Sequence, residues 1–377
     1  MRIAVVSQGF GYGGSYIAAA NIGKALAAEG HDLYYFAYQY TTNYSDLPED
    51  RLFQFGLPHK GIAEVVDKMG KGLEFLFHRS FVPADFAKPE LKRLLAYLDQ
   101  YKIDVVILNS FWSVTLFAKA LRENRPKLHT IAWMHEATDY SFGSLTKNYR
   151  PAYIAALTAV SAIVCLTHFD LKVFSQYNRN THVIYNPVVL ASHGQSPLTS
   201  HKIIFTTRLD TYIKGLDYLV EIAKQLPPGW KIQIAGQGRP NQVKTFKNMI
   251  ADVSPEHIEF IGSLDGNALA EHYQAGSMFL STSRTEGLGM VIIEAMSFGL
   301  PVVSFAHHGG REILEPDQTG LLVPVGDVSA MLKDINLLIS NVSLRHEYGE
   351  KSLKRYEAFK LPRVISQWSA VLDSLRD

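Results

Sequence analysis

The sequence predicts an α/β protein with two domains, each built around a doubly wound parallel sheet. The chain has 377 residues, of which 47% are hydrophobic, so it can bury two cores. Short β-branched runs recur along it, and many are followed by a glycine-containing turn and a helix-like segment. A polar stretch, 192–200, separates two series of such units. We therefore expect one domain over 1–190, a second over 200–358, and a terminal helix over 359–377.

Charge and composition exclude several classes of protein. The net charge of +1 argues against bulk electrostatic capture of nucleic acid. The single cysteine, Cys165, excludes an internal disulfide or a cysteine-based zinc cluster and suits a reducing compartment. Met1-Arg2 leads directly into a buried strand, so we expect no secretory signal. No apolar run reaches the roughly 18 to 20 residues of a membrane-spanning helix. The expected location is cytoplasmic.

The first strand–turn–helix–strand unit spans residues 3–37. Its turn matches the dinucleotide fingerprint G-x-G-x-x-G at Gly9, Gly11 and Gly14. That fingerprint also requires a carboxylate at the end of the second strand to hold a ribose, and Leu33–Ala37 runs into Tyr38-Gln39 instead. An NAD-dependent oxidoreductase is therefore a competing interpretation only. The alternative is a glycine loop kept small so that a ligand fits above it.

Residues 60–93 mix basic and aromatic side chains. One interpretation is an amphipathic surface that touches the inner face of a membrane. The other is a solvated helix with an apolar face toward the core.

Two buried strands, 104–108 and 128–133, follow, and 159–166 and 183–185 complete the first half. The second of these four leads into His135, at the carboxyl edge where open α/β sheets bind ligands. His135 is thus a candidate for positioning a substrate hydroxyl, although an isolated histidine is more often structural.

The second half opens with a strand at 202–207, followed by Arg208, Lys214 and a helix over 216–225. The two cations flank a short connection, so both can converge on one anion such as a diphosphate. The simpler alternative is a pair of solvated loop cations. A strand at 231–235, a glycine turn at 236–240 and a strand at 258–262 come next.

The stretch 281–303 consists of a strand end, a polar turn, a short apolar helix and a second strand. Gly287 and Gly289 leave the helix N-terminus open, so its amide groups can approach an anion. Glu286 lies in the turn, and Glu294 points back toward the N-terminus of its helix. This arrangement suits a nucleotide. Because both halves present a ligand-binding edge, a cleft between the two domains is the expected site.

Taken in order, these motifs resemble the retaining glycosyltransferases of the GT4 family, which have the GT-B fold of two Rossmann-like domains. The resemblance rests on the Gly13-Gly14 loop, His135, R-L-D-x-x-x-K-G, A-G-x-G, E-G-L-G-M-V-I-I-E-A-M-S-F-G-L-P-V-V and G-L-L-V-P-V-G-D. It spans the chain and is strongest over 202–330. It implies transfer of a hexose from a nucleotide diphosphate sugar, most commonly a UDP-sugar, to a hydroxyl of a glycan, lipid-linked or cell-surface polymer acceptor.

The resemblance also implies roles for individual residues. Arg208 and Lys214 would neutralise the leaving diphosphate, and Glu286 would meet the donor sugar. Glu294 would hold the ribose hydroxyls. Further donor contacts would come from His135, which touches the sugar, and from residues that border the phosphates or frame the base: Gly13, Gly14, Gly238, Arg239, Ile261, Gly287, Leu288 and Gly289.

The family's usual mechanism is front-face attack, in which the leaving diphosphate takes the acceptor proton. A covalent route needs a second carboxylate, for which Glu136 and Asp139 are the only weak candidates. The chain has no D-x-D triplet, so we expect no motif-held metal and no cofactor. A sugar-nucleotide epimerase on the same fold is a further alternative. The terminal helix either crosses to the first domain or packs on the second.

Overall fold

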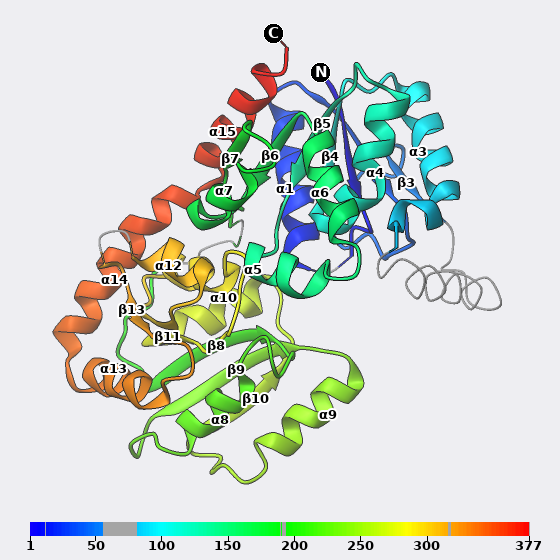
Figure 1. Ribbon diagram of the computed structural model, residues 1–377. Helices are drawn as coiled ribbons and strands as arrows, with labels where there is room; N and C mark the ends of the chain where they lie inside the picture. Colours follow the sequence, from blue (N-terminus) through cyan, green and yellow to red (C-terminus); the bar gives the residue numbers. More distant parts are fainter. Residues whose placement is uncertain (12, 56–80, 189, 191–193, 316–317, 377) are drawn as a thin grey trace. The chain divides into compact units, whose positions relative to one another are not determined.

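The computed structural model describes residues 1–11, 13–55, 81–188, 190, 194–315 and 318–376. They form two compact units, each with its own parallel sheet (Figure 1). Unit 1 comprises Met1–Pro187 with Leu361–Asp377, and unit 2 comprises Val188–Lys360. This is the GT-B class of architecture expected from the sequence.

Unit 1 contains a seven-stranded parallel sheet in the order β3-β2-β1-β4-β5-β6-β7. Its strands are β1 (Arg2–Ser7), β2 (Asp32–Ala37), β3 (Leu52–Gln54), β4 (Val105–Asn109), β5 (His129–Trp133), β6 (Ala162–Cys165) and β7 (Thr181–Val183).

Alternating side chains of this sheet enter two cores, one on each face. Ile3, Val5 and their neighbours in register pack with helices α1 (Gly14–Ala28) and α15 (Leu361–Asp373). Ala4 and Val6 belong to the opposite core, together with side chains of the helices on that face (Figure 1). Those helices are α3 (Lys88–Tyr101), α4 (Ser110–Asn124), α6 (Arg150–Ala159) and α7 (His168–Phe174).

The terminal helix α15 packs in unit 1. Trp368, fully buried, lies with its ring 4.9 Å from that of Trp133, and Ser369 donates a hydrogen bond to Glu29 at 2.7 Å. The apolar residues spaced along this helix therefore complete the core of the first unit.

Unit 2 contains a six-stranded parallel sheet in the order β10-β9-β8-β11-β12-β13. Its strands are β8 (Lys202–Arg208), β9 (Lys231–Gln237), β10 (Ile258–Gly262), β11 (Met278–Ser281), β12 (Val302–Phe305) and β13 (Leu321–Val323). Its helices are α8 (Leu216–Ala223), α9 (Pro240–Met249), α10 (Gly266–Gln274), α11 (Met290–Ser297), α12 (His308–Leu314), α13 (Val328–Ser340) and α14 (Val342–Tyr356).

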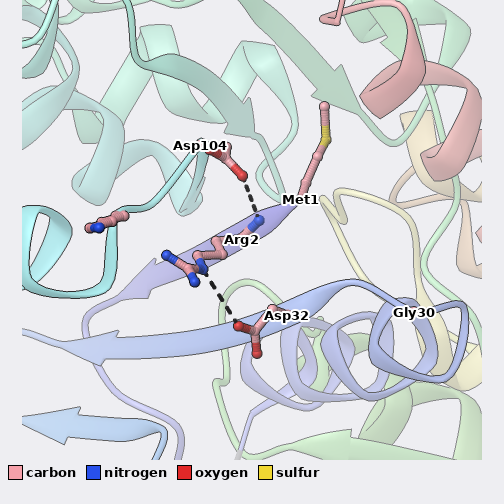
Figure 2. Close-up of a pocket in the computed structure, with 6 residues that line it drawn as sticks. Met1, Arg2, Gly30, Asp32 and Asp104 are labelled. Atoms are coloured by element: carbon pink, nitrogen blue, oxygen red, sulfur yellow. Dashed lines mark hydrogen bonds and ion pairs between the residues drawn. The ribbon is translucent and has the colours of Figure 1, made fainter.

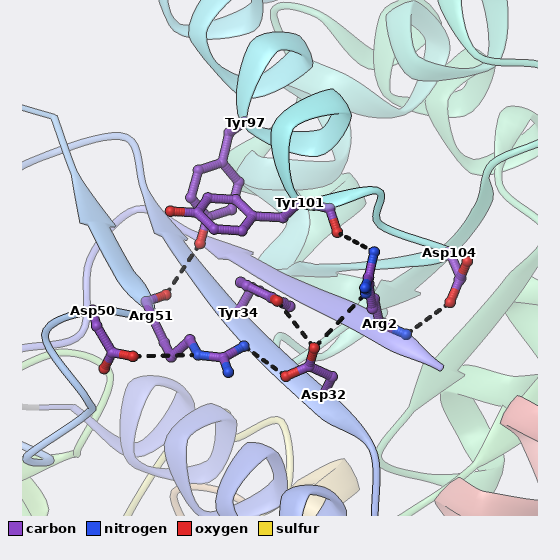
Figure 3. Close-up of polar contacts among 8 residues, drawn as sticks. All are labelled: Arg2, Asp32, Tyr34, Asp50, Arg51, Tyr97, Tyr101 and Asp104. Atoms are coloured by element: carbon purple, nitrogen blue, oxygen red, sulfur yellow. Dashed lines mark hydrogen bonds and ion pairs between the residues drawn. The ribbon is translucent and has the colours of Figure 1, made fainter.

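The amino ends of the unit 1 strands are joined by a charged network. The Arg2 amide donates to Asp104 at 2.7 Å, next to the hollow shown in Figure 2. Arg51 and the Tyr34 hydroxyl donate to Asp32 at 2.6 and 3.0 Å (Figure 3). Asp32 therefore stabilises the start of β2, at the end of the sheet opposite to the carboxyl edge where such sheets bind ligands.

Several predicted boundaries were wrong by a few residues. Gly236 and Gln237 continue β9 instead of forming a turn, because they pair with the end of β8. The strand predicted at 159–166 is the shorter β6, Ala162–Cys165. The strand predicted at 183–185 is β7, Thr181–Val183, which begins and ends earlier in the chain. Part of the expected linker packs on unit 2: Ser196 and Leu198 are buried, and the Ser196 amide donates to the Phe298 carbonyl at 2.8 Å.

No helix in the described part of the chain is both long enough and apolar enough to cross a membrane. The basic–aromatic segment predicted at 60–93 lies outside the described residues up to residue 80. Its remainder, 81–93, enters the 3₁₀ turn Pro83–Phe86 and the start of α3.

Candidate functional site

Each sheet has one point at which the strand order reverses. In unit 2 this point lies between β8 and β11, and in unit 1 between β1 and β4. Helices leave neighbouring strands toward opposite faces at such a point, so the two loops that follow the strands leave room for a ligand. The loops at the unit 2 reversal are 209–215 and 282–289, and these contain Lys214 and Glu286.

Lys214 and Glu286 form an ion pair across these two loops. Their side chains are only 9% and 15% exposed, and the Ser283 hydroxyl donates to Glu286 at 2.7 Å. Burial by itself would raise the pKa of Glu286. The charges of Lys214 and His307 and the hydrogen bonds from Lys214 and Ser283 outweigh burial and hold this pKa below its ordinary value. Glu286 is therefore a carboxylate near neutral pH.

The backbone of the two loops is also joined. The Thr282 hydroxyl donates to the Lys214 carbonyl at 2.9 Å, and the Arg284 amide donates to the Ile213 carbonyl at 2.8 Å. Gly215 has φ +59°, and a Cβ there would lie 2.0 Å from the Thr282 carbonyl oxygen. Only glycine permits this approach, so the glycine that follows Lys214 sets how closely the two loops meet.

Arg284 forms a second link between the loops. Its guanidinium donates two hydrogen bonds to Asp217, at 2.9 and 2.6 Å, and one to the Tyr212 carbonyl at 2.8 Å. It also lies 4.1 Å from the centre of the Tyr218 ring. A planar guanidinium suits this combination of a forked carboxylate contact and an aromatic face. Arg284 thus holds the segment that contains Lys214.

Glu294, in α11, is oriented by a residue from another helix. The Tyr273 hydroxyl donates to its carboxylate at 2.6 Å, and the Tyr273 ring stacks on Phe298 with 5.6 Å between centroids. Burial raises the pKa of Glu294, while the Tyr273 hydrogen bond opposes the rise. Tyr273 is fully buried, so the carboxylate has a fixed direction.

The remaining donor candidates of unit 2 lie on the carboxyl side of the same sheet. Arg208, the last residue of β8, is exposed, and its guanidinium has no hydrogen bond or ion pair within the described residues. Gly238 and Arg239 follow β9, and Ile261 is in β10. A Cβ at Gly238 would lie 2.9 Å from the Leu209 Cβ, so this glycine allows the ends of β8 and β9 to pack closely.

The turn before α11 contains Gly287, Leu288 and Gly289. Leu288 is buried, and Gly289 has φ +94° and caps the helix. A Cβ at Gly309 would lie 2.4 Å from the Leu288 carbonyl oxygen, so α12 packs directly against this turn. The turn is therefore held by its packing against α12 and by the ion pair between Glu286 and Lys214.

In unit 1, His135 follows β5 and is held by two asparagines. Its Nε2 lies 2.6 Å from Asn109 Oδ1, and its Nδ1 lies 3.3 Å from Asn186 Nδ2. The amide of Asn186 donates, so Nδ1 accepts and Nε2 carries the proton that Asn109 receives. Burial lowers the pKa of His135 to about 3, so the imidazole is neutral. Asn186 Oδ1 is buried and has no hydrogen-bond partner in the described structure.

Glu136, the neighbouring residue, lies at the N-terminus of α4. Its carboxylate accepts from the Phe111 amide at 3.5 Å. Burial raises the pKa of Glu136 to about 7, against the effect of backbone donors. Ser110, the first residue of α4, has φ +80°, an uncommon value for a residue other than glycine. Asp139, the other candidate for a second carboxylate, is exposed.

The glycine loop of unit 1 packs against the chain itself. A Cβ at Gly9 would lie 2.4 Å from the Thr41 side chain, whereas a Cβ at Gly14 would meet nothing within 4 Å. Gly13 precedes α1 and caps it. Gly9 is thus required for contact with residues after β2, where a dinucleotide fingerprint would have its carboxylate. This arrangement does not favour the dinucleotide interpretation.

Sequence reasoning missed the residues that hold the site residues in place. These are Asn109 and Asn186 around His135, and Tyr273, Thr282, Ser283 and Arg284 in unit 2. A usable signal existed for Asn109 and Asn186, because each directly follows or closely follows a predicted strand at the ligand edge. Tyr273 and Arg284 gave no signal, since their partners are distant in sequence.

Two parallel-sheet units with candidate site residues at both carboxyl edges are the architecture of the GT-B class of glycosyltransferases, and comparison with known proteins agrees. Residues 192–355 match the family described as glycosyl transferases group 1, and residues 12–192 match glycosyltransferase family 4. Together the two matches span almost the whole chain. The chain belongs to the GT4 family of glycosyltransferases.

Individual relatives support this assignment. An uncharacterized glycosyltransferase of Haemophilus influenzae is 27% identical over 289 residues, which are 74% of this chain and 79% of that protein. Sucrose-phosphate synthase from Thermosynechococcus elongatus superposes with a TM-score of 0.77 at 18% identity, covering 100% of this chain and 99% of that one. HepE from Anabaena, crystallised with UDP and glucose, gives 0.79 at 18% identity, covering 99% and 100%. At these identities the structures are alike in fold.

Proposed function

We propose that this glycosyltransferase moves a hexose from a UDP-sugar to a hydroxyl of a glycan, lipid-linked or cell-surface polymer acceptor, with retention at the anomeric carbon. The observation that carries the proposal is the buried pair of Lys214 and Glu286 at the strand-order reversal of unit 2, with the unpaired Arg208 at the end of β8. The structure of HepE, which has the same fold, contains UDP and glucose, and this supports a UDP-sugar as donor.

The diphosphate is expected to bind at this pair. In the free protein, Glu286 neutralises Lys214, so an incoming diphosphate would share the ammonium while Arg208 adds a second positive charge. As the bond between the anomeric carbon and the diphosphate breaks, negative charge grows on the leaving oxygen, where fixed cations stabilise it most. Glu294, held by Tyr273, would accept the ribose hydroxyls. Glu286 would accept a hydroxyl of the sugar.

In this proposal, the anomeric configuration is retained because the acceptor attacks the same face of the sugar that the diphosphate leaves. The acceptor oxygen bonds to the anomeric carbon, the carbon–diphosphate bond breaks, and the acceptor proton passes to the leaving diphosphate. His135, neutral because of burial, would position a hydroxyl of the donor sugar without changing charge. No D-x-D triplet is present in the sequence, which supports transfer without a bound metal.

A hydrolysis screen over UDP-glucose, UDP-galactose, UDP-N-acetylglucosamine and GDP-mannose tests the donor and needs no acceptor. Hydrolysis of a UDP-hexose is the expected result, and release of sugar only from GDP-mannose would overturn the choice of base. Lys214→Ala and Glu294→Ala should each lower turnover at least ~10²-fold, the scale of lost charge stabilisation or positioning. Near-normal turnover of both variants would refute the site.

Three further measurements test the stereochemistry, the metal dependence and the oxidoreductase alternative. Proton NMR of the fresh product should show the anomeric configuration of the donor, and an inverted centre would remove the front-face mechanism. Activity should survive excess EDTA, whereas a strict need for Mg²⁺ or Mn²⁺ would contradict metal-independent transfer. Thermal stability measured with NAD and with UDP distinguishes the oxidoreductase alternative from the glycosyltransferase. At 100 times its dissociation constant, the true ligand stabilises the folded protein by about 2.7 kcal/mol.

A further inference from the structure

We propose that the acceptor of this enzyme is an uncharged glycan, bound on a neutral surface at the carboxyl ends of β1 and β2. We call this surface the neutral rim: Gln8, Gln39, Tyr40, Thr42 and Tyr44. The inference rests on the proposed transfer reaction and adds the chemical class of the acceptor to it.

The first observation is the absence of charge in the sequence that forms the rim. Residues 7–16 and 38–44 contain no Asp, Glu, Lys, Arg or His, in a chain of which 19% is charged. Side chains that bind phosphate or carboxylate are usually cationic, because desolvating an anion without a counter-charge is costly. Lys24, the next cation after the glycine loop, donates instead to the Ser45 carbonyl.

The second observation is the exposure of aromatic and amide side chains on the rim. Tyr40 and Tyr44 are 54% and 42% exposed, among the most exposed large rings in the described structure. A tyrosine face combines apolar area with a polar hydroxyl, which suits the apolar face and hydroxyl edge of a sugar ring. Gln39 is exposed beside them, and an amide both donates to and accepts from hydroxyl groups.

The third observation is that the rim is held rigidly. The Phe10 amide donates to the Thr41 hydroxyl at 2.9 Å, and the Tyr44 amide donates to the Phe10 carbonyl at 3.2 Å. The Gln8 and Gln39 side chains are joined at 3.0 Å, and Tyr16 donates to Gln8 at 3.3 Å. A surface ordered before binding loses less entropy when a ligand arrives.

The rim also lies at the correct edge of the sheet. Ser7, the last residue of β1, receives a hydrogen bond from Asn109 Nδ2 at 3.1 Å, and Asn109 holds His135. The rim and His135 therefore belong to one carboxyl edge within unit 1, next to the reversal between β1 and β4. A neutral sugar can rest there on amide and hydroxyl groups without the desolvation cost of an anion.

The test is direct binding, followed by transfer. Saturation-transfer NMR would compare neutral glucose and N-acetylglucosamine oligosaccharides with uronate and glycerol-phosphate oligomers of the same length. We expect binding of a neutral oligomer, weakened at least ~10-fold by Tyr40→Ala and by Tyr44→Ala, and unchanged by Phe169→Ala, which removes a ring of similar exposure on α7. Gln39→Lys should favour the anionic oligomers.

Transfer from the identified donor would then be followed by mass spectrometry. The Tyr40 and Tyr44 variants should raise the acceptor KM at least ~10-fold more than the donor KM. Binding or transfer confined to anionic oligomers, or tyrosine variants indistinguishable from Phe169→Ala, would overturn the inference while leaving donor hydrolysis as evidence for the function. Neutral binding without hydrolysis of any donor would contradict the proposed function and leave the rim as a glycan-binding surface.

Discussion

Replacing Lys214 by methionine should expose the energetics of the buried pair in unit 2. The change removes the ammonium but keeps the apolar length of the side chain, so Glu286 is left 15% exposed with the Ser283 hydroxyl as hydrogen-bond donor. Removing one partner from a buried ion pair costs roughly 3–5 kcal/mol. Because the hydroxyl still serves the carboxylate, we expect the lower end, about 3 kcal/mol near pH 7.

This loss should depend on pH in a defined direction. In the native protein the pKa of Glu286 is lowered, so the pair stabilises the fold at pH values above the unfolded pKa of the carboxyl group. This stabilisation is lost as the pH falls through the folded pKa. Without Lys214, burial dominates and raises the pKa of Glu286 above its unfolded value. The carboxyl then becomes neutral in mild acid, so the difference between native protein and variant should narrow as the pH falls below neutrality.

Urea unfolding at several pH values measures this difference. NMR of fluorotryptophan-labelled protein reports unit 2 by itself, since Trp230 is the only one of the 4 tryptophans in that unit. Lys231→Met is the matched control, because Lys231 and Glu259 are 4.0 Å apart with side chains 34% and 43% exposed, and such pairs contribute about 0–1 kcal/mol.

The double variant Lys214→Met/Glu286→Gln removes both charges and should regain much of the lost stability. If Lys214→Met loses no more stability than Lys231→Met, or if its loss is the same at every pH, the buried-pair reasoning is refuted.

Three further outcomes are expected. Arg284→Ala and Arg284→Lys should each lower turnover by ~10²-fold, because only the guanidinium donates two hydrogen bonds to Asp217 and so holds the Lys214 segment. A loss of thermal stability with unchanged turnover would contradict this role. Tyr273→Phe should raise the donor KM about tenfold, or about 1.4 kcal/mol, with a smaller effect on turnover, because Glu294 loses its hydrogen bond. Tyr356→Phe is the control. Equal kinetics of the two variants would count against the role of Tyr273 in orienting Glu294. His135, with a folded pKa of about 3, binds no proton while the unfolded chain does below about pH 6.5, so it should cost up to about 1.4 kcal/mol of stability per pH unit on acidification. His135→Gln should flatten the urea-stability curve between about pH 6.5 and 5, and parallel curves would show that His135 is not buried neutral.

Local sequence patterns predicted the elements well because they report burial, and burial is what alternation and helical spacing reflect. β1, β4, β8 and β12 all fall within a residue or two of the apolar runs that predicted them, while the end of β9 did not. Gly236 and Gln237 were predicted as a turn from their composition, but pairing with β8 extends the strand through them. Pairing with a strand distant in sequence overrides local preference at such ends.

The same distinction applies to the site. By itself the sequence determined the two α/β units, their carboxyl edges, and the types of candidate site residue placed there, because strand, turn and helix signals are local. Only the tertiary structure decided that Lys214 pairs with Glu286, that Tyr273 directs Glu294, that Arg284 holds the Lys214 segment, and that two asparagines fix the neutral form of His135. The physical reason is that these contacts join residues whose separation in sequence is unrelated to their distance after the sheet forms.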